Sequence, residues 1–380
     1  MPAPIRVAVL GATGSIGTQT LEAIAALGPD RAVVVALSAH SDEEGLLAAA
    51  RAWPVAELAL SGASARDPRV VHGGAEGLVR LVERCGADVV VNGVAGAAGL
   101  MPSLAAIRSG ARLALANKET MVMAGSLVMD EARRRGTRVI PVDSEHAAVF
   151  ALHERFGADS IEELVLTASG GAFRDRPLGS FGSITVAEAT RHPNWSMGAK
   201  ITIDSATMAN KGLEVIEAVR LFGIAPERVK VLVHPQSRVH ALVRTTDGTL
   251  YAQVSEPDMR VPIQNAITWP ALEPCAFGRL DLAGARLEFS EPEAARYPLL
   301  DLAYEALRSG EGACVAYNAA DEVAVEAFRS GTLPYLGIAR VVEAVLAGRW
   351  PARVATFDEV LAADAAARAA ARNAVKGIHV

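Results

Sequence analysis

The chain has 380 residues, of which 51% are hydrophobic and 21% charged, so it is long enough for two or three domains and too apolar to be disordered throughout. Its 37 basic and 43 acidic residues give a formal net charge of −6, which speaks against a broad nucleic-acid or anionic-membrane surface. We therefore expect neither nucleic acid nor membrane as a partner.

Cysteine usage and the absence of long apolar runs indicate the compartment. The three cysteines, Cys85, Cys275 and Cys314, are far apart and form no CxxC pair, so the sequence suggests neither a zinc ribbon nor a disulfide framework. No run of about 18 apolar residues is present. The first residues also lack the basic and apolar regions of a secretory signal. We expect a cytoplasmic protein.

The first 142 residues alternate short apolar strands with helical segments. A helix is expected over Ser15–Leu27, and strands are expected at Ile5–Leu10, Ala32–Ser38, Leu58–Ser61, Asp88–Asn92, Leu113–Ala116 and Val139–Val142. Continuous apolar strands separated by helices are typical of a parallel sheet covered on both faces. The fold class is therefore α/β, with a Rossmann-like, doubly wound nucleotide-binding domain over residues 1–142.

From residue 143 onward the pattern changes to an α+β arrangement. Expected elements are a strand at Leu164–Ser169, a polar loop over residues 170–198, a single helix over Ser205–Phe222, and strands at Val229–His234, Val239–Thr245 and Thr249–Val254. Four prolines then mark an extended linker, and helices dominate the rest. We predict a catalytic domain over 143–268, a linker over 269–298 and a C-terminal helical domain over 299–380.

A glycine-rich loop joins the first strand to the first helix. Gly11-Ala-Thr-Gly14-Ser-Ile-Gly17 allows a tight turn and lets a pyrophosphate approach the helix N-terminus. This context predicts dinucleotide binding, although a glycine-rich turn without a ligand is the alternative. The second strand ends without the carboxylate that often binds the ribose 2′-hydroxyl of NAD, which favours NADPH. His40 and Ser41 offer donors there, while the acidic run from Asp42 fits the first turn of a helix.

Three further motifs carry candidate chemistry. Asp143 and Glu145 follow a strand and are two residues apart, so both can point to one side; a helix N-cap is the alternative that local sequence favours. Asn210, Lys211 and Glu214 share one helix face, which also fits a solvated salt bridge. His146 is expected to be an ordinary helix residue.

The third motif combines Ser169-Gly170-Gly171 with the later loop. The serine hydroxyl and the glycine N–H groups suit an anion, and Trp195 on a glycine-bounded loop suits a lid over a substrate. The alternative is a surface loop whose tryptophan packs on its own domain.

In this order the motifs resemble those of the 1-deoxy-D-xylulose 5-phosphate reductoisomerase family. The resemblance runs from Gly11 to Asn318-Ala-Ala-Asp-Glu322 and includes Ala116-Asn-Lys-Glu119, Val142-Asp-Ser-Glu-His146, His192-Pro-Asn-Trp-Ser-Met-Gly198 and Asp204-Ser-Ala-Thr-Met-Ala-Asn-Lys-Gly-Leu-Glu214. It implies NADPH- and metal-dependent isomerisation and reduction of 1-deoxy-D-xylulose 5-phosphate to 2-C-methyl-D-erythritol 4-phosphate, in the non-mevalonate isoprenoid pathway. It also implies a homodimer.

The resemblance also implies the roles of individual residues. Asp143, Glu145 and Glu214 are the implied metal ligands, and together with Lys118 and His192 the implied catalytic residues. Carboxylate ligands suit Mg²⁺ or Mn²⁺, with Co²⁺ as an alternative. The implied substrate contacts are Lys118, Ser144, Glu145, Ser169, His192, Trp195, Met197, Ser205, Asn210, Lys211 and Glu214. The implied NADPH contacts are Thr13, Gly14, Ser15, Ile16, Asn117, Glu119 and Gly198.

One segment departs from the family pattern. Where the family often has a Gly-Lys/Asn-Asn type segment at the adenosine phosphate, this chain has His40, Ser41 and Asp42, which we carry over as cofactor contacts. Two rival functions use the same first domain. A semialdehyde-dehydrogenase-like enzyme requires a nucleophilic cysteine, and a non-enzymatic dinucleotide sensor requires no carboxylate cluster.

Overall fold

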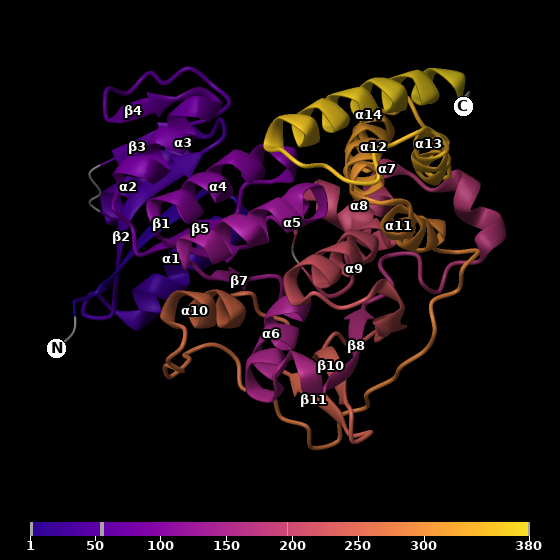
Figure 1. Ribbon diagram of the computed structural model, residues 1–380, viewed down its shortest axis with the longest axis horizontal. Helices are drawn as coiled ribbons and strands as arrows, with labels where there is room; N and C mark the ends of the chain where they lie inside the picture. The colour runs from indigo at the N-terminus through magenta and orange to yellow at the C-terminus, as the bar shows by residue number, and fades with distance from the viewer. Residues whose placement is uncertain (1–2, 54–56, 196, 379–380) are drawn as a thin grey trace. The chain divides into compact units, whose positions relative to one another are not determined.

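The computed structural model describes residues 3–53, 57–195 and 197–378, which form two compact units (Figure 1). Unit 1 contains Met1–Thr120, Val128–Phe150 and Asp258–Arg279, and unit 2 contains Met121–Leu127, Ala151–Pro257 and Leu280–Val380. Two helices, α5 (Lys118–Arg135) and α6 (Ser144–Phe156), contribute residues to both units. Among the described residues, no helix combines the length and the apolar composition that crossing a membrane requires.

Unit 1 is built on a seven-stranded parallel sheet with the order β4-β3-β2-β1-β5-β6-β7. Its strands are β1 (Ile5–Leu10), β2 (Ala32–Ala39), β3 (Glu57–Leu60), β4 (Val70–Gly73), β5 (Val89–Asn92), β6 (Arg112–Leu115) and β7 (Val139–Pro141). The chain builds outward from β1 in one direction through β2 and in the other through β5. This is the doubly wound arrangement, so the Rossmann-like prediction is confirmed. Strand β4 lacks an apolar run and was not predicted.

The helices of unit 1 cover this sheet and bury its apolar strands. They are α1 (Ser15–Leu27), α2 (Glu43–Ala52), α3 (Gly74–Arg84), α4 (Leu100–Ser109), parts of α5 and α6, and α10 (Arg260–Thr268). Helix α10 packs beside α1 (Figure 1) and buries Ile263, Ala266 and Ile267 in the same core as β1. Residues 258–279 therefore pack with unit 1, although the sequence boundaries place them in the catalytic domain and the linker.

Unit 2 contains a mixed four-stranded sheet with the order β11-β10-β8-β9. Strands β8 (Ile161–Ala168) and β9 (Val229–Val233) are parallel, whereas β10 (Val239–Thr245) pairs antiparallel with β8 and with β11 (Leu250–Val254). The hairpin between β10 and β11 turns at Gly248, as the Asp247-Gly248 pair predicts. The expected α+β character with an antiparallel element is confirmed.

The helices of unit 2 form a second core, in which many of the buried residues are alanines. They are α7 (Val186–Ala189), α8 (Ala199–Thr207), α9 (Ala209–Phe222), α11 (Pro298–Ser309), α12 (Glu311–Arg329), α13 (Gly337–Leu346) and α14 (Phe357–Gly377). Helix α12 packs against α11, α13 and α14 (Figure 1), and Tyr317 and all its alanines except Ala327 are buried. The C-terminal helices and the mixed sheet thus belong to one compact unit.

Two predicted elements differ from the structure. The single helix expected over Ser205–Phe222 is two helices, α8 and α9, because Met208 adopts a left-handed conformation with φ 61°. Apolar periodicity continues across this break, so it gave no sequence signal. The segment over 170–198 is not an unbroken loop, since it contains a 3₁₀ helix at Leu178–Ser183 and α7. Phe173 and Phe181 of this segment pack against Tyr335.

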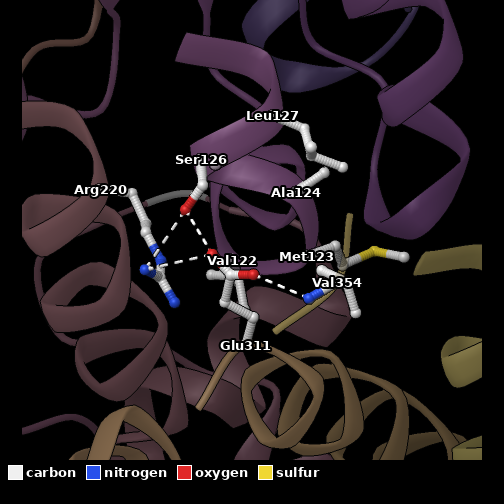
Figure 2. A pocket seen from close by; sticks show the side chains of 9 residues that line it. Val122, Met123, Ala124, Ser126, Leu127, Arg220, Glu311 and Val354 are labelled. Carbon is white, nitrogen blue, oxygen red and sulfur yellow. Dashed lines mark hydrogen bonds and ion pairs between the residues drawn. The ribbon is translucent and has the colours of Figure 1, made fainter. Parts of the chain in front are cut away.

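Helix α5 kinks at Ala124, where φ is −139° and ψ is 21°. Beside the kink, the Ser126 hydroxyl donates to Glu311 at 2.6 Å, and Arg220 lies 3.8 Å from the same carboxylate. Figure 2 shows these side chains pointing toward one another at a pocket. The volume of this cavity is about 10 Å³. That volume holds about one water molecule. The cavity is therefore a packing feature, far too small for a sugar phosphate.

Candidate active site

The glycine-rich loop lies between β1 and α1 and is held by the end of β2. Ala12 N donates to the Ser38 carbonyl at 2.7 Å, and Gly11 N donates to the Ser38 hydroxyl at 3.2 Å. Gly11 has φ 79°, and a Cβ on Gly17 would lie 2.1 Å from the Gly11 carbonyl oxygen. The loop therefore requires glycine at both positions for its turn and for close helix packing.

The N-terminus of α1 is open to a ligand. Gly14 is the N-cap residue and provides no side-chain cap, and the first turn contains no acidic residue. Thr13 and Ile16 are half-buried, while Gly14 and Ser15 are exposed. Uncapped N–H groups at a helix N-terminus favour an anion such as a pyrophosphate. The predicted NADPH contacts in this loop are thus available to a cofactor.

Asn117 and Glu119 lie at the start of α5. The Asn117 side chain accepts from Thr120 N at 3.0 Å and donates to the carbonyls of Val94 and Gly96 at 2.8 and 2.9 Å. It also donates to Glu119 at 3.0 Å. The buried amide therefore joins α5 to the loop after β5, a structural role that sequence analysis did not identify.

Lys118, Asp143 and Glu145 come together within unit 1. The Lys118 ammonium pairs directly with the Asp143 carboxylate, and His146 Nδ1 lies 3.5 Å from it. Burial alone would raise the pKa of Asp143, but Lys118 and His146 hold it well below its usual range. The Asp143 carboxylate is therefore anionic at neutral pH.

The start of α6 positions Glu145. Ala147 N donates to the Asp143 carbonyl at 2.8 Å, and the Ser144 hydroxyl donates to the Glu145 carboxylate. Glu145 N lies 3.3 Å from the Asp143 carboxylate, which is thus also placed as a helix cap. Capping and a ligand role are compatible, because a carboxylate has two oxygens.

A second polar group lies on helix α9, which belongs to unit 2. Both Asn210 and Lys211 donate to the Glu214 carboxylate, as their spacing predicts. The Glu214 side chain is 1% exposed, and that of Lys211 is 4% exposed. The solvated salt bridge considered above is therefore wrong, since this pair is buried.

Ser169, His192 and Ser205 form a third polar group, also in unit 2. His192 Nε2 lies 3.0 Å from the Ser169 hydroxyl and 3.1 Å from the Ser205 hydroxyl. These residues come from the end of β8, the loop before α8, and α8 itself. Three segments thus converge on one small set of hydroxyl and imidazole donors.

The imidazole of His192 has a defined protonation state. Its Nδ1 accepts from Asn194 N at 3.1 Å and from Trp195 N at 2.9 Å, so the proton of the neutral ring is on Nε2. Burial lowers the pKa of His192 from 6.5 to about 4. At neutral pH the ring therefore donates one N–H toward the serine hydroxyls.

The loop before α8 carries Trp195, Met197 and Gly198. Asn194 ties it to the turn after β9, donating to the Pro235 carbonyl at 2.7 Å and the Ser237 hydroxyl at 3.0 Å. The Trp195 ring lies edge-on to His240, with 6.3 Å between centroids. In this arrangement the tryptophan contacts a residue of its own unit, and the lid stays a prediction. Ser196 of the motif lies outside the described residues.

Two of the cysteines, Cys85 and Cys314, do not fit a nucleophilic role. Burial raises the pKa of Cys85, and it raises the pKa of Cys314 to about 11. Both thiols remain protonated at neutral pH, so neither is an activated nucleophile. Neither of these two cysteines therefore supports a semialdehyde-dehydrogenase-like enzyme.

Two anchoring residues were missed in the sequence. Ser38 and Asn194 each bond a segment distant in the chain, and neither belongs to a periodic pattern. A polar residue ending a buried strand was the only available signal for Ser38.

Three protein-family models match most of the chain. The model described as 1-deoxy-D-xylulose 5-phosphate reductoisomerase matches residues 7–125, and its C-terminal domain model matches residues 139–222. A third, described as DXP reductoisomerase C-terminal domain, matches residues 254–370.

Curated relatives and solved structures match over nearly their whole length. The reductoisomerase of Geobacter metallireducens is 46% identical over a match that covers 97% of this chain and 99% of the relative. The reductoisomerase of Bordetella avium is also 46% identical, over 97% of this chain and 98% of the relative. The Zymomonas mobilis enzyme in complex with NADPH has a TM-score of 0.90 and 39% identity, and the match covers 99% of this chain and 100% of that enzyme. A structure of DOX-P reductoisomerase with NADPH, fosmidomycin and magnesium has a TM-score of 0.90 and 37% identity, with 98% coverage of each chain. The chain therefore belongs to the 1-deoxy-D-xylulose 5-phosphate reductoisomerase family.

Proposed function

We propose that the protein converts 1-deoxy-D-xylulose 5-phosphate to 2-C-methyl-D-erythritol 4-phosphate, using NADPH and a divalent cation, in non-mevalonate isoprenoid biosynthesis. The observation that carries the proposal is the set of three polar groups described above, on a chain 46% identical to curated reductoisomerases. Solved relatives described as complexes with NADPH and with magnesium support the two cofactors.

Unit 1 is the proposed NADPH-binding unit. When bound, NADPH supplies the hydride for the reduction. The uncapped first turn of α1 receives the pyrophosphate, through the loop from Thr13 to Ile16. Glycine at position 17 keeps the helix close to the loop, and Ser38 fixes the loop from β2. Asn117, Glu119 and Gly198 are the other proposed contacts.

Asp143, Glu145 and Glu214 are the proposed metal ligands. When bound, a divalent cation acts as a Lewis acid on the substrate oxygens. All three residues offer carboxylate oxygens, which suit Mg²⁺ or Mn²⁺ rather than a soft metal. Lys118 holds Asp143 ionised, and Lys211 pairs with Glu214. Lys118 is also a proposed substrate contact.

The substrate phosphate is assigned to unit 2. Ser169, His192 and Ser205 offer converging donors, and Asn210 and Lys211 extend the set along α9. The neutral His192 ring donates through Nε2 without adding a charge. Ser144, Trp195 and Met197 complete the proposed contacts, with the segment predicted over residues 170–198 as the lid that excludes water.

We also propose a cytoplasmic homodimer. The described cysteines are all free, which fits a reducing compartment. Strand β11 is an edge strand of the mixed sheet, and its Leu250 and Tyr251 are 44% and 37% exposed. An unpaired edge with apolar side chains is a surface that a second copy can cover.

The test is product identification with purified protein. Supplied with 1-deoxy-D-xylulose 5-phosphate, NADPH and Mg²⁺, the protein is expected to oxidise one NADPH for each 2-C-methyl-D-erythritol 4-phosphate detected by ³¹P NMR and mass spectrometry. NADH should give a lower kcat/KM. NADPH oxidation that yields no branched polyol phosphate contradicts the proposal.

A further inference from the structure

The loop after β3 brings an arginine to the carboxyl end of β2. We propose that Arg66, together with His40, binds the 2′-phosphate of NADPH and so determines the preference for NADPH over NADH. The proposal rests on the proposed use of NADPH, and it concerns a residue that has no role in the site described above.

The acid nearest the end of β2 is not free to select a ribose hydroxyl. Rossmann domains use an acid there for the 2′-hydroxyl of NAD, or a nearby arginine for the 2′-phosphate of NADP. Asp42 accepts from Gly45 N at 2.9 Å, as the N-cap residue of α2. A Cβ on Gly45 would lie 2.2 Å from the second Asp42 oxygen. The Asp42 carboxylate thus faces its own helix.

The His40 ring has a fixed position beyond the end of β2. Its Nδ1 lies 3.3 Å from the Ser61 hydroxyl, and Gly62 N donates to the His40 carbonyl at 2.7 Å. A Cβ on Gly62 would lie 2.0 Å from the ring, so the imidazole packs directly against this glycine. His40 is exposed, which leaves the ring accessible to a ligand.

Glu43 fixes Arg66 at the same edge of the sheet. The Glu43 side chain, 6% exposed in the first turn of α2, accepts from Arg66 N at 2.6 Å and from Arg66 Nε at 2.8 Å. It also accepts from Asp67 N at 2.9 Å. The Arg66 side chain remains 79% exposed, although its backbone and Nε are held. Its two terminal nitrogens are therefore presented to solvent.

Arg66 differs from the other arginine of this loop. Arg69 makes a two-point ion pair with Asp67, at 2.9 Å through Nε and 2.8 Å through Nη2. Residues His40 to Asp42 contain no lysine or arginine, whereas Glu43, just after them, holds Arg66. A guanidinium with two free nitrogens matches the geometry of a phosphate.

The experiment compares two ligands that differ by the 2′-phosphate. Binding of adenosine 2′,5′-bisphosphate and of 5′-AMP to the full chain is measured by calorimetry for wild type, Arg66→Gln and the matched control Arg69→Gln. Wild type should prefer the bisphosphate. Arg66→Gln should weaken bisphosphate binding about tenfold or more and leave 5′-AMP unchanged. Arg69→Gln should change neither, and His40→Gln should weaken the bisphosphate alone, by less than Arg66→Gln.

Three results overturn the inference. The inference is wrong if Arg66→Gln retains wild-type affinity for the bisphosphate. It is also wrong if Arg66→Gln weakens the binding of both ligands equally, because equal loss means a damaged loop. A loss with Arg69→Gln as large as with Arg66→Gln also contradicts it. If wild type and Arg66→Gln prefer the bisphosphate equally, the assignment of NADPH as cofactor stands and only the proposed role of Arg66 is contradicted.

Discussion

His192 shows how hydrogen bonds at a single ring define what the ring can do. Two backbone N–H groups point at Nδ1, so a second proton has no place there, and burial disfavours the charged form. The neutral His192 ring, next to two hydroxyl groups, can donate to a phosphate oxygen without adding a positive charge to the site. The motif predicted that His192 contacts substrate, but its tautomer depends on the loop conformation and could not be predicted.

The pKa of His192 gives a pH prediction. Because the pKa is about 4 in the folded chain and 6.5 in the reference state, the unfolded chain binds more protons between these values. The free energy of unfolding should therefore fall as pH decreases from 6.5 toward 4, and fall less in His192→Gln. Urea unfolding across this window tests the slope, and an NMR titration of labelled histidine tests the residue. A His192 midpoint near 6.5 contradicts the assignment.

At the scale of elements, the tight packing of α9 explains a glycine in a helix interior. A Cβ on Gly212 would lie 2.6 Å from the Tyr317 hydroxyl and 2.8 Å from the Ala303 Cβ. These neighbours come from α12 and α11, so the glycine permits close approach of three helices. The sequence marked Gly212 as a position needing a reason, but its neighbours lie some 90 to 105 positions away and no local pattern identifies them.

Gly212→Ala should destabilise the protein although alanine is the better helix former. Overpacking typically costs about 1–3 kcal/mol, which exceeds the gain of about 1 kcal/mol in helix propensity. Urea unfolding of Gly212→Ala should therefore give a lower midpoint than wild type. Gly377→Ala, at the open end of α14 with nothing within 4 Å, is the matched control and should not lower it. A raised midpoint for Gly212→Ala refutes the packing argument.

At the scale of the whole molecule, each unit is assembled from separate stretches of chain. Periodicity predicted the parallel sheet of unit 1, because continuous apolar strands have few other solutions. It did not predict that α10 returns to that sheet, since the apolar face of a nine-residue helix does not specify its partner. The proposed ligands also come from separate stretches of the chain, since Glu214 follows Asp143 and Glu145 by some seventy positions. The proposed metal chemistry is therefore a claim about the whole chain.

The most direct test of that claim is turnover against Mg²⁺ or Mn²⁺ concentration, for wild type and Glu145→Gln, with NADPH binding measured separately. Removing one of three carboxylate ligands should raise the metal concentration needed for half-maximal rate steeply and lower kcat, while NADPH affinity stays within about twofold. Glu154→Gln, an exposed acid on the same helix, should match wild type. Metal-independent turnover by wild type, or an unchanged metal dependence in Glu145→Gln, would contradict the account.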